Sequence, residues 1–331
     1  MFFVKQNNID LHYTLNKITM KKFTKIIGIA FLAMSVLSCS DDNESQPTIV
    51  DIASDNADFS ILVRALERTD LVSTLDGSGQ FTVFAPTNAA FNTFFTSLGA
   101  GVTVENVDAV VLKKILLNHV IGDEIKSGEL PAATYASTLS PFNTSVNAPT
   151  ISMFVQKSGS VVTINGGSAN GGATVTTADL DASNGVIHVV GNVIAIPTIK
   201  NHAVANPNFS TLTSLLVTQN LAATLDGTAG SPFTVFAPLN SAFDTATLNL
   251  YSGLSSGDKT AVLLYHVVGG VNVRSNAIPT GDITTLQGQA FSITGTVIDD
   301  ASSVNKNIVL TDVQCSNGIV HAIDKVLLPN L

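Results

Sequence analysis

The stretch FTVFAPTNAAF, Phe81–Phe91, returns 152 residues later as FTVFAPLNSAF, Phe233–Phe243. In each copy a short aromatic and β-branched run predicts a strand, a proline ends it, and the residues after the proline have the spacing of a helix. Thr87 and Asn88 are both candidates for the N-cap of the helix in the first copy. The second copy has Leu239 in place of Thr87 but retains Asn240 opposite Asn88, so the Asn is the better candidate in both copies. We therefore predict that each Asn caps the helix that follows its strand.

The repeat extends well beyond this stretch and keeps its order along the chain. The other matching segments are Thr48–Phe59 with Thr198–Phe209, Leu116–Ile121 with Leu263–Val268, and Gly185–Ile194 with Gly318–Leu327. A repeat of this length is a duplicated domain rather than a solenoid unit. We predict two domains, 48–197 and 198–331, and because almost no linker separates them we expect their relative orientation to be semi-fixed.

The order of the secondary-structure signals within each copy predicts an α+β fold. In the first copy, residues 59–72 and 108–120 carry apolar side chains at helical spacing. Short β-branched runs separated by glycine-rich turns follow from 151 to 177. Helices come first and strands mostly later, so we expect the two kinds of element to be segregated.

The composition excludes several classes of protein. Apolar residues make up 45% of the 331 residues and charged residues only 12%, which is typical of globular domains rather than of a disordered chain. Without residues 1–38 the chain has 11 basic and 24 acidic residues, a net charge of −13. Such a surface repels phosphate backbones, so nucleic-acid binding is not expected.

The N-terminal residues have the layout of a secretory signal peptide. A basic start at Met20 is followed by an apolar run, Ile26–Leu37, that is short for a membrane span. We predict that residues 1–38 are removed and that Met20 is the true start. The segment Val36–Cys39 resembles a bacterial lipobox, which implies cleavage before Cys39 and lipid attachment to it. The alternative is an ordinary signal peptide with a chance cysteine.

An acidic linker, residues 39–47, follows the predicted anchor. Its Asp41, Asp42 and Glu44 resemble the export signal that places lipoproteins on the outer face of the outer membrane in some Gram-negative bacteria. This resemblance predicts an outer-membrane lipoprotein exposed at the cell surface. The alternative is a solvated linker on a protein that faces the periplasm.

Four recurring histidines are the first candidates for chemistry. His119 and its counterpart His266 are predicted on the apolar face of a helix, and His188 and His321 lie within apolar strands. A metal site needs clustered Cys, Asp or Glu at ligand spacing, and the sequence has no such cluster. We therefore interpret the histidines as core residues bonded to the backbone, and we expect no metal and no cofactor. Cys315 is expected to be a buried, inert thiol.

No catalytic motif is present. The sequence lacks a G-x-S-x-G elbow, an H-E-x-x-H pair and a Gly-Lys-Ser/Thr phosphate loop. The glycine-rich run 165–172 has neither the lysine nor the following helix of a phosphate loop, and we predict a mobile loop between strands there. The paired carboxylates Asp299–Asp300 lie in a predicted loop. We therefore predict a protein that is not an enzyme.

The repeated segments resemble the fasciclin-like domain family. The family's two conserved boxes resemble Phe81–Phe91 and 184–194 in the first copy, and Phe233–Phe243 and 317–327 in the second. The family's Tyr-His pair is intact as Tyr265–His266, whereas the first copy has Asn118–His119. The resemblance covers nearly all of 48–331. It implies that each domain is a β-rich wedge with a helical layer and no cofactor, used for adhesion or extracellular binding rather than catalysis.

The resemblance also implies candidate partner-binding residues. Some animal members of the family engage integrins through an Asp-Ile pair before the second box and through the Tyr-His region. The matching positions here are Asp179 and Leu180, Asp312 and Val313, and Tyr265 and His266. The flanking residues of the animal motif are absent. The alternative is that each Asp is a strand-end residue in a turn.

We predict a lipid-anchored adhesion module that binds an extracellular protein or matrix component through its two domains. The chain has no Trp and few Tyr, the residues that sugar sites use for stacking, so a protein partner is favoured over a polysaccharide. The alternatives are a glycan-binding module and a structural accessory subunit of an outer-membrane uptake complex. The loops 130–178 and 279–309 have diverged between the copies, so we expect partner specificity to lie there.

Overall fold

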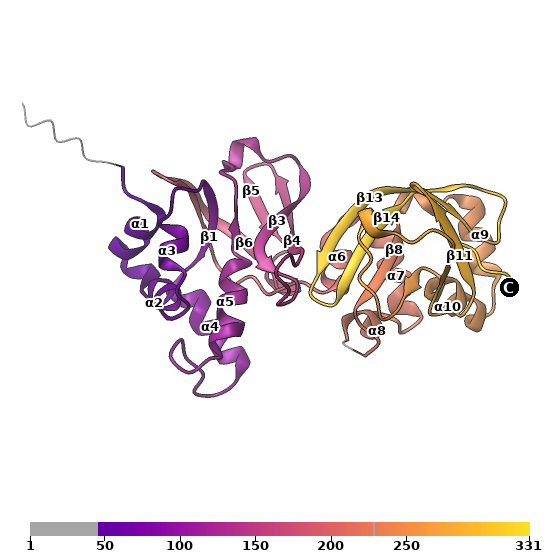
Figure 1. The fold of residues 1–331 in the computed structure, drawn as a ribbon, viewed down its shortest axis with the longest axis horizontal. Coiled ribbons are helices and arrows are strands. Elements are labelled where there is room, and N and C mark those ends of the chain that lie inside the picture. The colour runs from indigo at the N-terminus through magenta and orange to yellow at the C-terminus, as the bar shows by residue number, and fades with distance from the viewer. Residues whose placement is uncertain (1–45, 228) are drawn as a thin grey trace, which may run out of the picture. The chain divides into compact units, whose positions relative to one another are not determined.

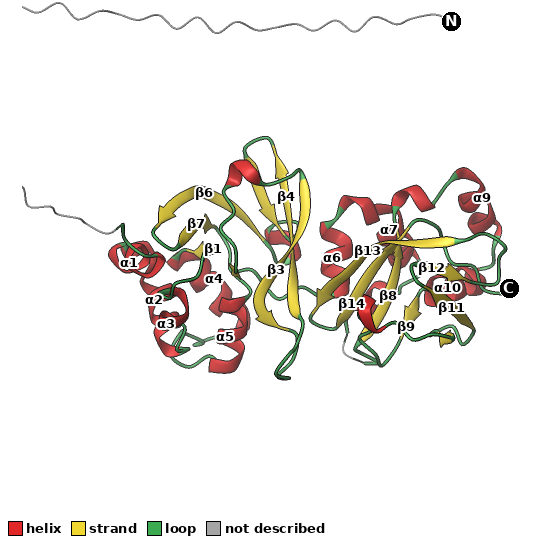
Figure 2. Ribbon diagram, turned by 45° about the horizontal axis from the view of Figure 1, so that its top comes forward, coloured by secondary structure: helices red, strands yellow, loops and turns green. Residues whose placement is uncertain are grey.

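The computed structural model describes residues 46–227 and 229–331 of the 331-residue chain. The predicted signal peptide, Cys39 and most of the predicted acidic linker lie outside the described residues. Within the described part of the chain, none of the helices has the length and apolar character needed to cross a membrane. The described residues form two domains of one design, shown in Figures 1 and 2.

The first domain places its helices before most of its strands, as the sequence predicts. The helices are α1 (Ile49–Asp55), α2 (Ser60–Arg68), α3 (Val72–Leu75), α4 (Asn88–Leu98) and α5 (Ala109–Leu117), with 3₁₀ helices η1 (Ala57–Phe59), η2 (Ser127–Glu129) and η3 (Ser168–Asn170). The strands are β1 (Phe81–Pro86), β2 (Val120–Ile121), β3 (Ala133–Pro141), β4 (Thr150–Ser158), β5 (Val161–Ile164), β6 (Ala173–Ala182) and β7 (Gly185–Val190). These strands form a closed barrel.

The second domain repeats this order, and the strands in the middle of its sequence, β10–β12, are shorter than their counterparts β3–β5. The helices are α6 (Ile199–Ala205), α7 (Ser210–Thr218), α8 (Ala222–Asp226), α9 (Thr245–Gly253) and α10 (Ser256–Leu264), with η4 (Pro207–Phe209), η5 (Asn240–Ala242) and η6 (Ser275–Ala277). The strands are β8 (Phe233–Pro238), β9 (Val267–Val268), β10 (Asp282–Thr284), β11 (Ala290–Thr294), β12 (Val297–Asp299), β13 (Lys306–Cys315) and β14 (Gly318–Ile323). They form an open sheet in the order β10-β11-β12-β13-β14-β8-β9.

The last strand of each domain pairs in parallel with the first. β7 lies beside β1, from Gly185 opposite Phe81 to Val190 opposite Pro86, and β14 lies beside β8 in the equivalent register. On the other side, β1 pairs antiparallel with β2, and β8 pairs antiparallel with β9. The stretch that is written twice is therefore an inner strand of its sheet in both domains.

Both faces of this inner strand are buried, which explains why all but one of its residues are apolar. Successive side chains of a strand point to opposite faces. Val83 and Ala85 pack with Phe91 in the core beneath the helices, whereas Phe84 packs with Met153 in a second core among the barrel strands. The second domain divides its core in the same way. Figure 1 shows α1–α5 gathered on one side of the strands of the first domain.

The prediction that Asn88 caps the helix after its strand is wrong. Thr87 is the N-cap of α4, and its hydroxyl accepts a hydrogen bond from the Ala90 N–H at 3.3 Å. Asn88 is the first residue of that helix, and its side chain serves α2 instead. Its Oδ1 accepts from the Ile61 N–H at 2.9 Å, and its Nδ2 donates to the Ala57 carbonyl at 2.8 Å.

Asn240 departs from the prediction in the same way. Its Oδ1 accepts from the Thr211 N–H at 3.0 Å, and its Nδ2 donates to the Pro207 carbonyl at 2.9 Å. The physical reason is that phenylalanine, at the N-cap positions of α2 and α7, has no side-chain acceptor for the free N–H groups of the first turn. The acceptor is supplied from a distant segment, which local sequence patterns do not reveal.

A glycine opens the last strand of each domain because the first strand passes too close for a side chain. Gly185 has φ 143°, and a Cβ on it would lie 2.0 Å from the Phe81 carbonyl oxygen. Gly318 has φ 152°, and its Cβ would lie 2.1 Å from the Phe233 carbonyl oxygen. Glycine alone combines this backbone conformation with this approach.

Gly185→Ala is expected to destabilise the first domain by roughly 2–4 kcal/mol, because the new methyl group pushes β1 and β7 apart at an unfavourable φ. Gly128→Ala is the matched control, since a Cβ at Gly128 meets no atom within 4 Å. Urea unfolding of both variants, followed by circular dichroism, measures the difference. Equal free energies of unfolding for the two variants would contradict the role assigned to Gly185.

Candidate functional site

The candidate partner-binding aspartate of each domain lies in a β-bulge. The register of β6 on β7 shifts just before Leu180, and that of β13 on β14 shifts just before Val313. Asp179 has φ 60° and Asp312 has φ 62°. Asp adopts this left-handed conformation more readily than most residues because its short side chain forms local hydrogen bonds. Both copies therefore place the same residue type at an equivalent irregular point of the sheet.

The carboxylate of each aspartate binds a serine at the start of a 3₁₀ helix. Asp179 accepts hydrogen bonds from the Ser127 N–H at 2.7 Å and from the Ser127 hydroxyl at 2.5 Å. Asp312 accepts from the Ser275 N–H at 2.8 Å and from the Ser275 hydroxyl at 2.6 Å. We did not identify these serines from the sequence. The signal is the repeated pattern KSGELP (126–131) and RSNAIP (274–279).

These contacts keep both aspartates ionised at neutral pH. Partial burial acts to raise the pKa of Asp179. The hydrogen bonds from Ser127 and the positive charge of Lys126 outweigh this effect and lower that pKa. The pKa of Asp312 is lowered against partial burial in the same way, by Ser275 and Arg274. The two side chains are 37% and 20% exposed. Each bulge therefore presents one edge of a charged carboxylate to solvent.

A buried histidine completes each bulge. The Asp179 N–H donates to His188 Nδ1 at 3.2 Å, and His188 Nε2–H donates to the Ile125 carbonyl at 3.0 Å. His321 repeats both contacts, with the Asp312 N–H at 3.3 Å and with a backbone carbonyl at 2.9 Å. Because Nδ1 accepts a hydrogen bond in each case, each ring is neutral and carries its proton on Nε2.

Serine, aspartate and histidine thus meet in each domain, but not in the order that nucleophilic catalysis requires. A catalytic serine needs a hydrogen bond to a histidine that can take its proton. Ser127 donates to Asp179 instead, and both ring nitrogens of His188 are engaged with the backbone. The bulge therefore has no histidine that is free to act as a general base for the serine. Its polar groups fix the backbone and leave a carboxylate edge as the exposed feature.

The other candidate partner-binding residues are less accessible. Leu180 is half-buried, whereas Val313, Tyr265 and His266 are 2%, 0% and 2% exposed. The Tyr265 hydroxyl donates to a backbone carbonyl of β11 at 2.8 Å. No surface of Val313, Tyr265 or His266 is left for a partner to contact directly. Of the predicted set, the two bulge aspartates and Leu180 remain accessible.

His119 and His266 join a helix end to the C-terminal segment of their domain. His119 lies two residues beyond α5 and not on its face, which corrects the prediction. Its Nδ1–H donates to the Ile115 carbonyl and its Nε2 accepts from the Ile194 N–H, both at 2.8 Å. His266 repeats both bonds at 2.8 Å. Burial lowers the pKa of each ring to about 4, against the opposing effect of the bond to the helix.

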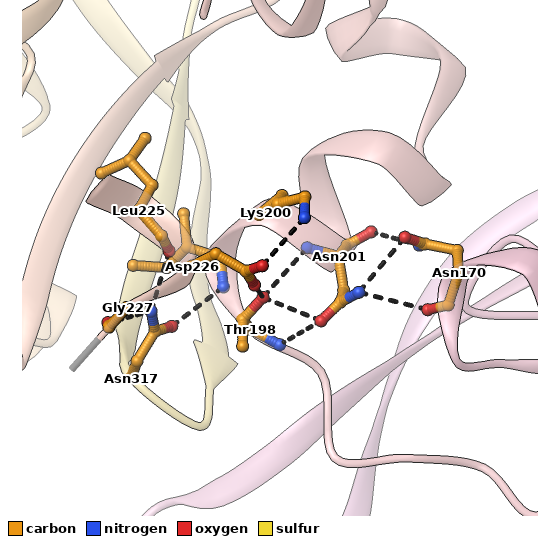
Figure 3. A network of polar contacts seen from close by, with 9 residues as sticks. Asn170, Thr198, Lys200, Asn201, Leu225, Asp226, Gly227 and Asn317 are labelled. Atoms are coloured by element: carbon orange, nitrogen blue, oxygen red, sulfur yellow. Dashed lines mark hydrogen bonds and ion pairs between the residues drawn. The ribbon is translucent and has the colours of Figure 1, made fainter. Parts of the chain in front are cut away.

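Two buried asparagines to which we assigned no role from the sequence act in a similar way. Asn184 accepts from the Ile49 N–H at 3.0 Å and donates to the Leu75 carbonyl at 2.6 Å, so it ties α1 to α3. Asn317 makes the equivalent bonds, at 3.0 Å and 2.8 Å, with α6 and α8 (Figure 3). Their signal in the sequence is an Asn-Gly pair at the start of each second box.

Two other kinds of chemical group can be checked among the described residues: clusters of metal ligands and the thiol of Cys315. No group of three or more His, Cys, Asp or Glu side chains in 46–227 and 229–331 is placed to hold a metal ion. Cys315 is a buried free cysteine, and burial raises the pKa of its thiol well above the usual value. This matches the inert thiol that the sequence predicts.

Comparison with known proteins agrees with this architecture. The family model described as Fasciclin domain matches residues 57–197 and 207–329. Protein sll1483 of Synechocystis sp. is 40% identical over 192 residues, which cover 53% of this chain and 94% of that protein. Periostin of Homo sapiens is 26% identical over 277 residues, which cover 81% of this chain but only 30% of periostin.

One further relative and one solved structure also match. Immunogenic protein MPB70 of Mycobacterium bovis is 34% identical over 131 residues, covering 38% of this chain and 65% of that protein. Among solved structures, a FAS1 domain pair from the insect cell adhesion molecule Fasciclin I aligns with a TM-score of 0.47 and 20% identity, covering 80% of this chain and 92% of that one.

Acidification from pH 7 towards pH 4.5 is expected to lower stability, because His119 and His266 have a folded pKa of about 4. The unfolded chain takes up protons near pH 6.5, before the folded chain does, so stability is lost as the pH falls through this window. Each histidine accounts for up to about 3 kcal/mol. His266→Gln lowers stability at pH 7 but should flatten the decline between pH 6.5 and 4.5. Urea unfolding at stepped pH tests this, and parallel profiles for wild type and variant would refute it.

Proposed function

Because the chain belongs to the fasciclin domain family, with a family domain in each half, we propose that it is a non-catalytic adhesion module that binds an extracellular protein or matrix component through both domains. Adhesion and binding are the roles known for fasciclin domains in homologues. The partner contact is assigned to the bulge aspartates and to the loops 130–178 and 279–309 that differ between the domains.

The observation that carries the proposal is that the serine and histidine of each bulge are bonded internally, whereas the aspartate keeps part of its carboxylate exposed. Ser127 and His188, the groups that could have supported catalysis, are bonded to the aspartate or to the backbone. What each bulge offers to the outside is a fixed, charged carboxylate edge, at Asp179 and at Asp312. A rigid anion on a surface suits recognition of a cationic or hydrogen-bond-donating group on a partner.

Two such sites in one chain favour a repetitive partner. When two sites are linked at a spacing that the target matches, the second contact is intramolecular and avidity rises about 10²–10⁴-fold over a single site. A matrix protein or other polymer offers its epitopes repeatedly.

The proposal also includes attachment through lipid at Cys39 and display at the cell surface. Such an anchor would hold the two domains where an extracellular partner can reach them.

The variant Asp179→Asn/Asp312→Asn is expected to lower adhesion at least tenfold. Asparagine keeps the size of the side chain and one acceptor for the serine, but it removes the exposed charge of each bulge. Binding of the secreted chain to immobilised matrix proteins and to a glycan array, by surface plasmon resonance, measures the effect and separates a protein partner from a glycan.

The matched control for this experiment is Asp76→Asn/Asp299→Asn. Both residues are exposed, one lies in each domain, and neither carboxylate forms a side-chain hydrogen bond among the described residues. The control variant should bind like wild type. Equal adhesion of the bulge variant and the control would remove the aspartates from the proposed site, and turnover of a substrate by the purified protein would overturn the proposal itself.

Cys39→Ala is expected to abolish labelling by a fatty-acid analogue and to release the protein from the membrane fraction. The thiol of Cys39 is the proposed point of lipid attachment, and loss of acyl chains removes the membrane affinity that they supply. Metabolic labelling followed by membrane fractionation measures both effects. Membrane retention of an unlabelled wild-type protein would contradict the anchor.

A further inference from the structure

The two domains meet through an aromatic cluster that is not repeated at the equivalent positions of the described chain. Tyr135 of β3 packs against Phe154 of β4, with ring centroids 4.9 Å apart, and against His202 of α6 at 5.4 Å, edge to face. The Asn206 Nδ2 donates to the Tyr135 hydroxyl oxygen at 3.2 Å. His202 is 1% exposed. On the other side, the Gln314 N–H of β13 donates to the Ser152 hydroxyl of β4 at 3.0 Å. We call this contact between β3–β4 of the first domain and α6 and β13 of the second the joint.

Polar and close-packed contacts extend the joint on one side. Asn170 Nδ2 donates to the Asn201 carbonyl at 2.8 Å, and Asn201 Nδ2 donates to the Asn170 carbonyl and side-chain oxygens, each at 3.2 Å (Figure 3). Gly166 lies so close that a Cβ on it would sit 3.1 Å from the Ala205 Cα. The glycine-rich run 165–172, predicted as a mobile loop, therefore packs on the second domain.

The strand registers identify the residues that occupy the same places in the second domain. Tyr135 lies opposite Phe154 in the first sheet, and Asp282 lies opposite Ser292 at the equivalent point of the second. Where the first domain offers two aromatic rings, the second offers an exposed carboxylate and a hydroxyl. A surface of this kind cannot reproduce the ring packing that the joint depends on.

The loop that follows on this face has changed as well. In the second domain the buried ammonium of Lys306 contacts Asp300, Ser302 and the Val304 carbonyl, which holds residues 300–306 against their own domain. Lys306 is 1% exposed and stands where the first domain has Ala173. The loop is therefore bound internally, whereas the equivalent loop of the first domain reaches its neighbour.

The helical part of the joint, the face of α6, has also been altered in its counterpart α1. Asn201, His202 and Ala205 correspond to Asp51, Ile52 and Asp55 at the constant offset of 150. Asp51 lacks the N–H donors with which Asn201 binds the Asn170 carbonyl, so α1 cannot reproduce that contact. Asp55 carries a charged side chain at the position where α6 has Ala205, which packs on Gly166.

These differences matter because the joint is head to tail. An interface that joins the back of one unit to the front of the next adds further units without limit unless the outer faces are changed. We infer that the residues on the outer faces of this domain pair prevent a contact like the joint from forming there. A second copy of the chain therefore does not add to either end. Each chain then acts as a closed pair of domains, and the inference stands whether or not the proposed adhesion function is correct.

The test rebuilds the joint on the outer faces of the full chain. One variant, Asp282→Tyr/Ser292→Phe, restores the two aromatic rings. A second, Asp51→Asn/Ile52→His/Asp55→Ala, restores the histidine of the helical face and removes the two carboxylates from it. Sedimentation velocity is measured up to about 1 mM, the effective concentration that a short linker provides. Wild type and each variant alone should stay monomeric. A one-to-one mixture of the two variants should form dimers and nothing larger. A chain with all five substitutions should form longer assemblies.

Two results would overturn the inference. One is concentration-dependent association of wild type that Tyr135→Asp abolishes, since the joint would then already link copies. The other is that the mixture of the two variants stays monomeric although the circular dichroism spectrum and melting temperature of each variant match those of wild type. The exchanged residues would then not decide whether two copies dock.

In a companion measurement, Tyr135→Asp/Phe154→Ser should broaden the distribution of interatomic distances from small-angle scattering. An unchanged distribution would also count against the joint.

Discussion

Each domain depends on the parallel pairing of its first strand with its last. The backbone of Phe81 approaches Gly185, and that of Phe233 approaches Gly318, more closely than any side chain allows. This pairing makes the repeated stretch an inner strand and buries both of its faces, one under the helices and one among the other strands. The position of the bulges follows, because β6 and β13 lie on the far side of the closing strands β7 and β14.

Buried polar side chains in this protein serve mainly the backbone. His119 and His266 bond a helix end to the C-terminal segment, Asn184 and Asn317 bond the first helix to the third, and His188 and His321 hold the bulges. A buried N–H or C=O without a partner is costly, so irregular chain segments packed inside a domain need side chains of this kind. The same groups are consequently engaged with the backbone and are not free to contact a bound molecule.

The sequence predicted what local pattern and internal repetition encode. The duplication, the α+β order, the strand at Phe81 and the burial of Cys315 were all readable, because apolar spacing and turn residues act over a few positions. The partners of Asn88 and Asp179 were not, because each side chain bonds a segment tens of residues away. His119 was placed on a helix face for the same reason: its spacing fits a helix, but the helix ends before it and its ring bonds that end.

The pairing of first and last strands also sets when a domain can fold. The contacts between β1 and β7 join residues about a hundred positions apart, and such non-local pairing is slow because a long loop closes before the contacts form. Until Val190 has been synthesised, the apolar stretch from Phe81 lacks one of its two neighbouring strands. The second half waits in the same way for Ile323. Each domain is therefore completed only at its own C-terminal end, so the first half can be assembled while the second half is still being made.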